Sequence, residues 1–328
     1  MNIGIKQLAD IAGVSIGTVD RALHNRSGID PVTKDRILSV ARELHYRPHY
    51  LARSLANGAS MTLGVVVYDL KNFFFSELVE VIEAKARALN YYVYLMLSHK
   101  DLEQEIESLD HLRGLNVDGI IMVPINWGSS FDRYLRGLDC PIVTISNRIS
   151  KNWPWVGIDD YAAMGDAVRY LAAKGYERIV YVSPNVAGAC ARNLSSADQR
   201  LLGYQNALRE NPALGGPVAV DSDEVRGILE LMGDFRAQKT CVLCSADIQA
   251  LDVLNVLKQN GIRIPQDVGL MGCDNIDVLD YIAPRLTTIA FSIKDIGSRA
   301  FDCMIGQIDG GPAESVVLTH TIVDGEST

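Results

Sequence analysis

The stretch that decides the first part of the fold runs from Ile5 to Arg26 and reads IKQLADIAGVSIGTVDRALHNR. Its first apolar residues recur at helical spacing, and Gly13 ends that helix. Ser15 can cap a second helix over residues 16–24 by accepting its free amide hydrogens. A helix, a glycine turn and a capped second helix predict a helix-turn-helix, whose second helix can enter the major groove of DNA.

A third helix follows this motif. Asp30 can serve as its N-cap, and Pro31 occupies the first helical position, where proline is favoured. Residues 46–48, which read Tyr-Arg-Pro, end this helix. Residues 50–57 could form a short further helix that Gly58 stops, although a segment of this length is not stable as an isolated helix in water.

From Thr62 onward, apolar strands alternate with amphipathic helices. The predicted strands are 63–67, 93–97, 119–123, 142–145, 179–183, 218–220, 241–244 and 268–271. The predicted helices are 76–90, 102–115, 131–138, 161–174, 196–210, 224–235 and 247–260. Near-continuous apolar strands between helices indicate an α/β fold whose parallel sheets are covered on both faces. Two such runs predict two doubly wound lobes, which bind ligands outside the carboxyl ends of their strands.

Charge is distributed unevenly along the 328 residues, whose formal net charge is −9. Residues 1–60 carry eight Lys or Arg and five Asp or Glu, a balance of +3. The remaining 23 basic and 35 acidic residues give −12. A cationic head on an anionic body suits a DNA contact that is confined to the head.

The six cysteines are scattered through the chain, which argues against a disulfide framework. Cys241 and Cys244 are spaced as CxxC, but residues three apart on a strand point to opposite faces. We interpret them as core residues, and we expect no metal site and no cofactor. No apolar run is long enough to span a bilayer, and no signal-peptide pattern follows Met1, so we expect a cytoplasmic protein.

The segment from Ile5 to Gly58 resembles the DNA-binding head of the lactose-repressor (LacI/GalR) family. The matching residues are Ala12-Gly13-Val14-Ser15, Thr18-Val19, Arg21, Asn25-Arg26, Tyr46-Arg47-Pro48 and Leu51-Ala52-Arg53-Ser54-Leu55. The resemblance continues at 63–67, 69–75, 269–275 and 284–289, and so covers essentially the whole chain. It implies a ligand-responsive, sequence-specific transcription regulator, expected to be a repressor, with a two-lobed sensor of the periplasmic-binding-protein fold. It also implies a homodimer on a palindromic double-stranded DNA operator.

The resemblance implies a set of DNA-contacting residues in the head and hinge. They are Ser15, Ile16, Gly17, Thr18, Asp20, Arg21, Asn25, Tyr46 and Leu55. Arg21 could read a guanine in bidentate fashion, or it could clamp a phosphate. Asp20 stands where the family usually has Ser, so either the operator differs or Asp20 pairs with Arg21 or another basic group. Leu55 could insert between base pairs in the minor groove, or it could only pack within a linker.

The resemblance also divides the chain into three parts. Residues 1–49 are the expected DNA-binding domain, 50–60 the hinge, and 61–328 the ligand-binding and dimerisation domain. Within the last part we expect lobe 1 at about 61–159 and 290–316, and lobe 2 at about 160–288 and 317–328.

Candidate ligand-binding residues follow strand ends or match family positions. They are Asp69, Asn72, Phe74, Asn147, Arg148, Arg200, Asp247 and Asp274. Carboxylates, amides and guanidinium groups around an aromatic ring suit a polyhydroxylated ligand, so we expect a sugar or sugar derivative. Asn147 stands where Asp is common, Ala246 where Asn is common, and Phe73 where Pro is common, so the usual sugar pattern is incomplete. Phe73 and Phe75 also fit a buried helix start, and Asp247 also fits a helix N-cap.

Two other classes of function account for less of the sequence. A sugar-binding protein with no DNA role would not need the helix-turn-helix, and an exported one would need a signal peptide. For an enzyme, the sequence contains no Gly-x-Ser-x-Gly elbow, no phosphate-binding Gly-rich lysine loop and no His-Glu-x-x-His. We therefore expect no catalytic residues and no enzymatic activity.

Overall fold

The computed structural model describes residues 3–23, 25–44, 46, 59–184 and 192–328. They belong to two compact units, Met1–Met61 and Thr62–Thr328. The predicted hinge helix over 50–57, with Leu55, lies outside the described residues. No helix in the described part of the chain is long and apolar enough to cross a membrane.

The first unit is a small three-helix head. Its helices are α1 (Ile5–Ala12), α2 (Ile16–Leu23) and α3 (Pro31–Glu43). Leu8, Val19 and Ile37, one from each helix, are fully buried at its centre. The third helix begins as predicted, because the Asp30 carboxylate accepts the Thr33 N–H at 3.0 Å.

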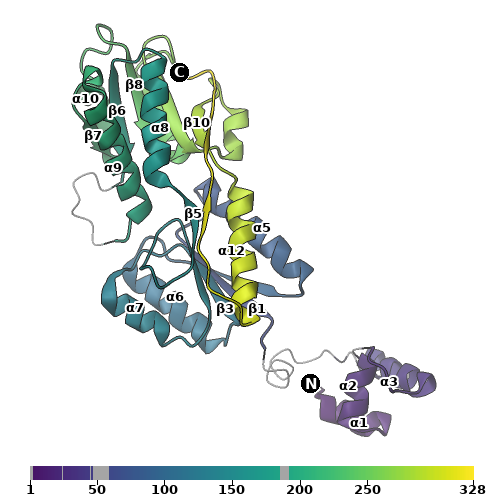
Figure 1. Cartoon of the computed structure of the whole chain (residues 1–328). Helices are drawn as coiled ribbons and strands as arrows, with labels where there is room; N and C mark the ends of the chain where they lie inside the picture. The colour runs from purple at the N-terminus through teal and green to yellow at the C-terminus, as the bar shows by residue number, and fades with distance from the viewer. Residues whose placement is uncertain (1–2, 24, 45, 47–58, 185–191) are drawn as a thin grey trace. The chain divides into compact units, whose positions relative to one another are not determined.

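The second unit contains two six-stranded sheets (Figure 1). The strands of the first sheet, in spatial order, are β11 (Val316–Leu318), β5 (Trp155–Ile158), β4 (Ile142–Ile145), β3 (Gly119–Met122), β1 (Thr62–Val67) and β2 (Tyr92–Leu97). The strands of the second are β12 (Thr321–Val323), β10 (Thr287–Ala290), β9 (Gly269–Asp274), β8 (Thr240–Cys244), β6 (Arg178–Ser183) and β7 (Val218–Asp221). All neighbouring strands are parallel except β12, which pairs antiparallel with β10 at the sheet edge.

Helices cover both faces of each sheet, as the apolar strands predicted. Around the first sheet lie α5 (Phe73–Ala88), α6 (Leu102–Gly114), α7 (Gly128–Arg136) and α12 (Ile293–Ile308). Around the second lie α8 (Asp160–Ala173), α9 (Ser195–Glu210), α10 (Ile228–Leu231) and α11 (Asp247–Gln259). On β1, Val65 and Val67 belong to the core that includes α5 and α12, whereas Val66 belongs to the core that includes α6 and α7. Alternate residues of one strand are therefore buried on opposite faces.

Some elements differ from the sequence prediction. The helix predicted over 224–235 is wrong: a 3-10 helix, Ser222–Gly227, precedes the single turn of α10. Gly233 then takes a positive φ of 61°, which ends any helical continuation. The helix α12 and the strands β5, β10, β11 and β12 were not predicted.

The chain passes between the two sheets three times. The crossings are at residue 159, at residues 291–292 and at residues 319–320. Each sheet is therefore completed by strands from distant parts of the sequence. Because Thr62–Thr328 is one compact unit, the space between the sheets can be described directly.

Candidate functional site

The turn between α1 and α2 has the geometry that its sequence predicts. Gly13 adopts a left-handed conformation with φ of 66°, which a residue with a side chain would adopt only at a cost. The Ser15 hydroxyl accepts the Thr18 N–H at 3.2 Å and lies 2.8 Å from the Thr18 hydroxyl. These bonds cap the N-terminus of α2, so that its first residues start a regular helix at the surface.

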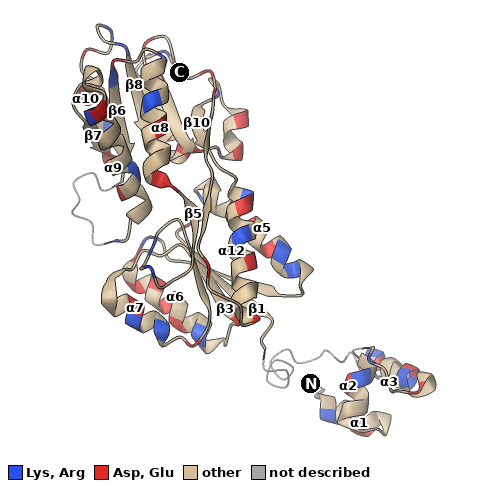
Figure 2. Ribbon diagram, viewed as in Figure 1, with Lys and Arg blue, Asp and Glu red and all other residues tan. Residues whose placement is uncertain are grey.

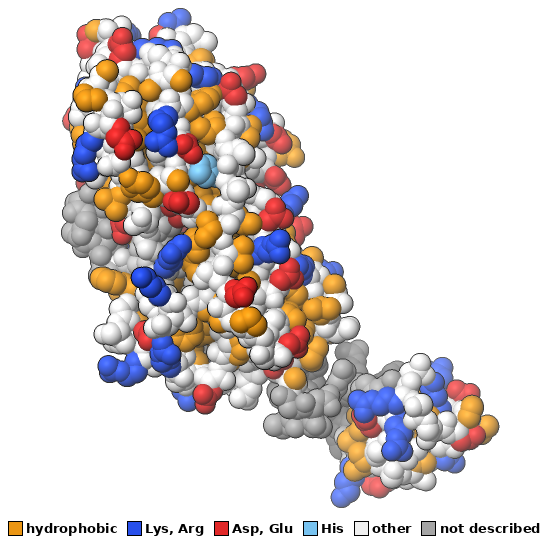
Figure 3. Space-filling view, viewed as in Figure 1, with side chains coloured by type: hydrophobic (Ala, Val, Ile, Leu, Met, Phe, Trp, Pro, Cys, Tyr) orange, Lys and Arg blue, Asp and Glu red, His pale blue; other side chains and the backbone are white. Residues whose placement is uncertain are grey.

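The first turn of α2 is open to solvent. Val19 and Ala22 fix the opposite face in the head core, which leaves Ile16 47% exposed, with Gly17 and Arg21 also exposed. On the face of the head drawn in Figure 3, Lys and Arg side chains gather. An exposed helix start beside basic side chains is an arrangement that can meet base edges and phosphates.

Asp20 pairs with Arg26, whose Nη1 lies 3.1 Å from the carboxylate. This is one of the two alternatives that the sequence leaves open, since the carboxylate has a basic partner within the head. Both side chains are substantially exposed, so the pair contributes little to stability and can rearrange. Tyr46 lies half-buried nearby, and burial, followed by the Asp20 carboxylate, raises its pKa. Asn25 accepts a hydrogen bond from the Lys34 ammonium just after α2.

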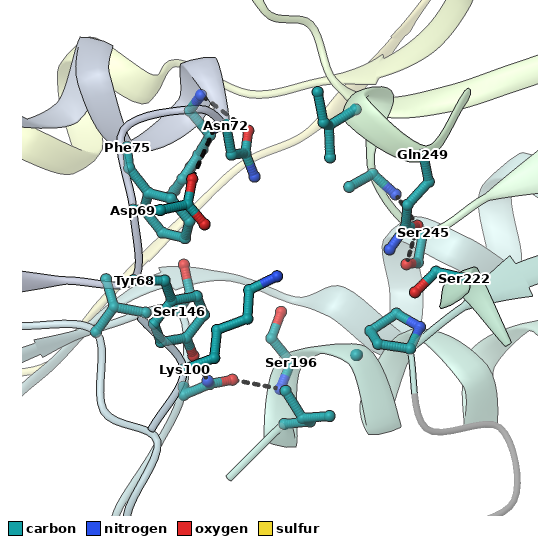
Figure 4. Close-up of a pocket in the computed structure, with 18 of the residues that line it drawn as sticks. Tyr68, Asp69, Asn72, Phe75, Lys100, Ser146, Ser196, Ser222, Ser245 and Gln249 are labelled. Atoms are coloured by element: carbon teal, nitrogen blue, oxygen red, sulfur yellow. Dashed lines mark hydrogen bonds between the residues drawn. The ribbon is translucent and has the colours of Figure 1, made fainter. Parts of the chain in front are cut away.

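A cavity of about 430 Å³ lies at the carboxyl ends of the strands of both sheets. Residues that follow or end eight different strands line it: Asp69, Lys100, Val123 and Ser146 from the first sheet, and Pro184, Ser222, Ser245 and Asp274 from the second. Figure 4 shows polar side chains from both lobes directed into this space. Its volume is within the range of sites that bind small molecules, roughly 300–1,000 Å³.

Arg200 forms ion pairs with two buried carboxylates at the cavity wall. Its Nε donates to the Asp160 carboxylate at 2.7 Å, and its Nη1 lies 3.6 Å from the Asp274 carboxylate. Nη1 also donates to the Ser245 carbonyl. The three charged side chains are only 11%, 7% and 6% exposed, and Figure 2 shows an acidic residue at the start of α8, where Asp160 lies.

Burial has its clearest effect on Asp274. It raises the pKa of Asp274, and the nearby Asp247 and Asp160 carboxylates add to the increase, while Arg200 opposes it. Asp274 also has φ of 122°, which a residue with a side chain rarely adopts. Strained residues of this kind concentrate at ligand sites, where the surrounding structure holds them in place.

Two family models match the chain. The model described as bacterial regulatory proteins, lacI family, matches residues 4–49. The model described as periplasmic binding protein-like domain matches residues 168–328. The HTH-type transcriptional regulator RegA of Clostridium acetobutylicum is 32% identical over 337 residues, which cover 100% of this chain and 99% of RegA. The chain belongs to the LacI family. The chain is a DNA-binding transcription regulator with a LacI-type helix-turn-helix head.

Two solved structures resemble this LacI-family regulator. A periplasmic binding protein/LacI transcriptional regulator from Alkaliphilus metalliredigens QYMF, complexed with D-xylulofuranose, is 25% identical with a TM-score of 0.71. The match covers 82% of this chain and 99% of that one. The lac repressor dimer, bound to operator and an anti-inducer, is 19% identical with a TM-score of 0.85, over 100% of this chain and 99% of the repressor. At that identity the second match supports the fold alone.

Six of the eight candidate ligand residues of this LacI-family chain line the cavity. They are Asp69, Asn72, Phe74, Asn147, Arg200 and Asp274. Asn72 caps α5 by accepting the Phe74 N–H at 3.1 Å, which positions both side chains at the cavity edge. Phe74 and Phe75 are buried, whereas Phe73 is 41% exposed. The alternative interpretation as a buried helix start therefore holds for Phe75 but is wrong for Phe73.

The amide of Asn147 explains why a carboxylate would not suit this position. Its Nδ2 donates to the Pro124 carbonyl at 3.1 Å, to the Asn193 carbonyl at 2.8 Å and to the Tyr68 hydroxyl. Its Oδ1 accepts the Ser196 N–H at 3.1 Å. An Asp here would direct a carboxylate at two carbonyl oxygens, which accept but cannot donate.

Arg148 and Asp247 do not line the cavity. The Arg148 guanidinium stacks 3.8 Å above the Trp155 ring, which draws it away from the strand ends. Asp247 is fully buried as the first residue of α11, where its carboxylate accepts from the Thr288 hydroxyl at 2.7 Å and the Ile276 N–H at 3.2 Å. The helix N-cap is Ala246, so the alternative prediction for Asp247 also fails by one residue.

Several lining residues were missed by the sequence analysis. They are Tyr68, Lys100, Ser146, Arg192, Ser196, Ser222, Ser245 and Gln249. Lys100, Ser146, Ser222 and Ser245 each follow a strand, so the rule that selected Asp69 and Asn147 could have found them. Gln249 carries no such signal, because its place depends on the capping of α11 through the Ala246 N–H at 3.1 Å.

Proposed function

We propose that this chain is a homodimeric, cytoplasmic repressor whose cavity binds a sugar or sugar derivative and whose ligand changes its affinity for an operator. The observation that carries the ligand assignment is the buried Arg200, placed between Asp160 and Asp274 at the wall of a cavity between two lobes. The 25% identical relative that was solved with D-xylulofuranose supports a carbohydrate ligand.

The cavity chemistry suits a molecule with many hydroxyl groups. Arg200 offers donors, Asp274 offers acceptors, and the hydroxyls of Ser222 and Ser245 offer both. The Phe74 ring lies among them and can pack against the apolar face of a sugar ring. These groups can form hydrogen bonds with hydroxyls on several sides of a ligand, which favours binding of a polyhydroxylated molecule. An apolar ligand would bind less well, because it would leave buried donors unpaired.

For the head, we propose that α2 lies in the major groove, with Ile16 and Arg21 on base edges. Ser15, Thr18, Asn25 and Tyr46 then contact the phosphate backbone, and Leu55 inserts into the minor groove. Two heads on one dimer explain strong binding to a palindromic site, because the second contact forms at a high effective concentration. The lac repressor, which shares the fold, was solved as a dimer bound to operator.

The coupling between ligand and operator is expected to pass through the three crossings. A ligand that contacts both lobes favours one relation between them, and any operator affinity that depends on this relation changes with it. A coupling free energy of about 1–3 kcal/mol, a factor of roughly 5–150 in affinity, is typical. We further infer that the cavity binds its ligand without converting it, as befits a family of transcription regulators.

The deciding experiment measures DNA binding with and without sugars. Fragments from the genomic region around the gene, labelled with fluorophore, are titrated with the full-length protein and followed by anisotropy. We expect one fragment to bind at least 10³-fold more tightly than random duplex, and one sugar class to change that affinity by 5-fold or more.

A truncated chain, residues 62–328, is the matched control, because this unit is compact by itself. It should bind the sugar and no DNA. If no fragment is preferred over random duplex, with or without sugars, the regulator assignment fails. If a preferred fragment exists but no sugar changes its binding or shifts the unfolding temperature, the sugar assignment fails alone.

A further inference from the structure

Lys100 is one of the cations that line the cavity. It follows β2, lines the cavity, and within the described part of the chain its ammonium forms no hydrogen bond or ion pair. Figure 4 shows the Lys100 side chain extended into the cavity, whose lining also includes Tyr68, Ser146 and Ser196. The other central cation, Arg200, is already engaged by two carboxylates. Lys100 therefore remains available to a ligand.

The backbone at Lys100 has an unusual conformation. His99 and Lys100 have φ values of 50° and 60°, the left-handed region that glycine and asparagine adopt most easily. The His99 N–H donates to the Tyr68 carbonyl at 2.9 Å, and the Asp101 N–H donates to the Ser98 carbonyl at 2.8 Å. These bonds hold two residues with long side chains in an unfavourable conformation at the cavity edge. Strain of this kind at a cleft points to a role in binding rather than in packing.

Neutral and basic groups share the cavity lining with Lys100. Tyr68, Ser146 and Ser196 carry hydroxyls, and the positive charge of Arg192 also acts on Tyr68, whose pKa it lowers against the larger effect of burial. Three carboxylates, those of Asp69, Asp223 and Asp274, also line the cavity. Asp69 accepts the Lys71 and Asn72 N–H groups at 2.8 Å and 3.0 Å, and Asp274 faces Arg200. Within the described residues none of these carboxylates is paired with the Lys100 ammonium, which can therefore bind a negative group.

We infer that the ligand carries an anionic oxygen group, a carboxylate or a phosphate, and that Lys100 binds it. This inference rests on the proposed function, since it refines which sugars the cavity takes. An ammonium paired with an anionic oxygen forms a stronger, shorter hydrogen bond than one paired with a hydroxyl. The effector is then a sugar acid or a sugar phosphate, and the remaining cavity groups bind its hydroxyls.

The test compares matched ligands on the full-length protein. Isothermal titration calorimetry is performed with glucose, galactose and mannose, with their uronates, and with their 6-phosphates. In at least one series the anionic member should bind at least 10-fold more tightly than the neutral sugar. Preference for the uronate assigns a carboxylate, and preference for the 6-phosphate assigns a phosphate.

Variants then test the role of Lys100. Lys100→Met should reduce the anionic preference at least 10-fold and leave the neutral sugar nearly unchanged, whereas Lys100→Arg should retain the preference. Lys151→Met, which removes an exposed lysine outside the cavity, should change neither affinity. Asp223→Asn tests the rival partner: if Lys100→Met and Asp223→Asn weaken the neutral sugar equally, the lysine serves that carboxylate and the inference is overturned.

The two levels of the proposal fail differently. Neutral sugars that bind as tightly as their acids and phosphates overturn the anionic ligand and leave the sugar sensor intact. An anionic preference that survives Lys100→Met overturns the role of Lys100. If no sugar, acid or phosphate in the panel binds, both the inference and the proposed carbohydrate ligand are rejected.

Discussion

Replacing Arg200 with Met should destabilise the second unit in a strongly pH-dependent way. The change keeps most of the volume of the side chain but removes its charge and leaves Asp160 and Asp274 buried beside each other. Removing one partner of a buried ion pair costs more than the pair contributes, because the remaining charge loses its compensation.

The magnitude follows from the geometry. At an effective dielectric constant of about 20, opposite charges about 4 Å apart attract by about 4 kcal/mol. Protonation limits the loss: at pH 7, about three pH units above the usual Asp pKa of about 3.9, neutralising one carboxylate costs about 4 kcal/mol. We therefore expect Arg200→Met to lower the free energy of unfolding by about 3–5 kcal/mol at pH 7.

The sign of the pH dependence is fixed by which state binds more protons. Arg200 opposes the increase that burial causes in the pKa of Asp274, so without Arg200 this pKa rises further and the folded state holds a proton that the unfolded state has lost. Stability then falls as pH rises above about 4. At pH 5, neutralising one carboxylate costs only about 1.5 kcal/mol, so the penalty should shrink by about 2 kcal/mol or more. The raised pKa of Asp274 gives the unmodified protein a weaker dependence of the same sign.

The assay is urea unfolding of the full-length protein, followed by far-ultraviolet circular dichroism at pH 7 and pH 5. Arg169→Met is the matched control, because Arg169 pairs with Asp166 at 2.6 Å while both side chains are about half exposed. It should cost at most about 1 kcal/mol. A second substitution, Asp160→Asn, should recover part of the stability lost in Arg200→Met. Equal stability of the two arginine variants, or a penalty as large at pH 5 as at pH 7, would refute the reasoning.

Three further predictions concern other parts of the chain. Arg21→Ala should cost about 1–3 kcal/mol of operator affinity and relax the choice of base at one position; a competition profile across operator variants that keeps its shape would instead assign Arg21 to a phosphate. Glu105→Gln should destabilise the protein by about 1–3 kcal/mol in thermal unfolding. The buried carboxylate accepts three N–H bonds from Ile125 and Asn126 at 2.8 Å, whereas the NH₂ group of Gln would face these N–H donors. Unchanged stability would contradict this expectation. Gly203→Ala should lower the free energy of unfolding by about 1–3 kcal/mol, because a Cβ there would lie 2.2 Å from the Tyr161 carbonyl oxygen. Gly306→Ala, with open space around the added Cβ, should be neutral or stabilising. The same sign for both changes would contradict the packing argument.

The alternation of helices and strands was predictable because burial on both faces leaves a strong pattern. A strand such as β1 is apolar at every position of 63–67, and its neighbours in the chain are amphipathic. The edge strands β11 and β12 leave no such pattern, since each has three residues that are only partly buried or exposed. Their position depends on pairing with strands far away in the sequence, which local pattern does not record.

The helix α12 was missed for a related reason. Gly297 and Gly306 interrupt its interior, and glycine lowers the expectation of a helix. In the structure Gly297 allows close approach to α5, since a Cβ there would lie 3.2 Å from the Leu78 carbonyl oxygen and the Val81 side chain. The residue that weakens the local pattern is the one that permits the packing.

The site was predictable as far as strand ends and matching family positions reveal it. Asp69 was found because it follows an apolar strand, and Arg200 and Asp274 because they match family positions; all three line the cavity. The pairing of Arg200 with Asp160, 40 positions apart, could not be deduced without the packing of α8 against α9. Asp247 matches a family ligand position, but its carboxylate accepts hydrogen bonds from β10 and from the loop after β9.

The threefold passage of the chain between the sheets has a consequence for synthesis on the ribosome. When the polypeptide has been made as far as Ala290, the first sheet still lacks β11 and the whole of α12, although its other strands were finished by residue 158. The apolar surface that Phe301 and Met304 later cover must therefore stay open while residues 159–304, about 145 in all, are translated. At about 5–20 residues per second, that interval lasts on the order of ten seconds. During it the exposed apolar surface of the emerging sensor can be bound by chaperones, while the complete head has already left the ribosome.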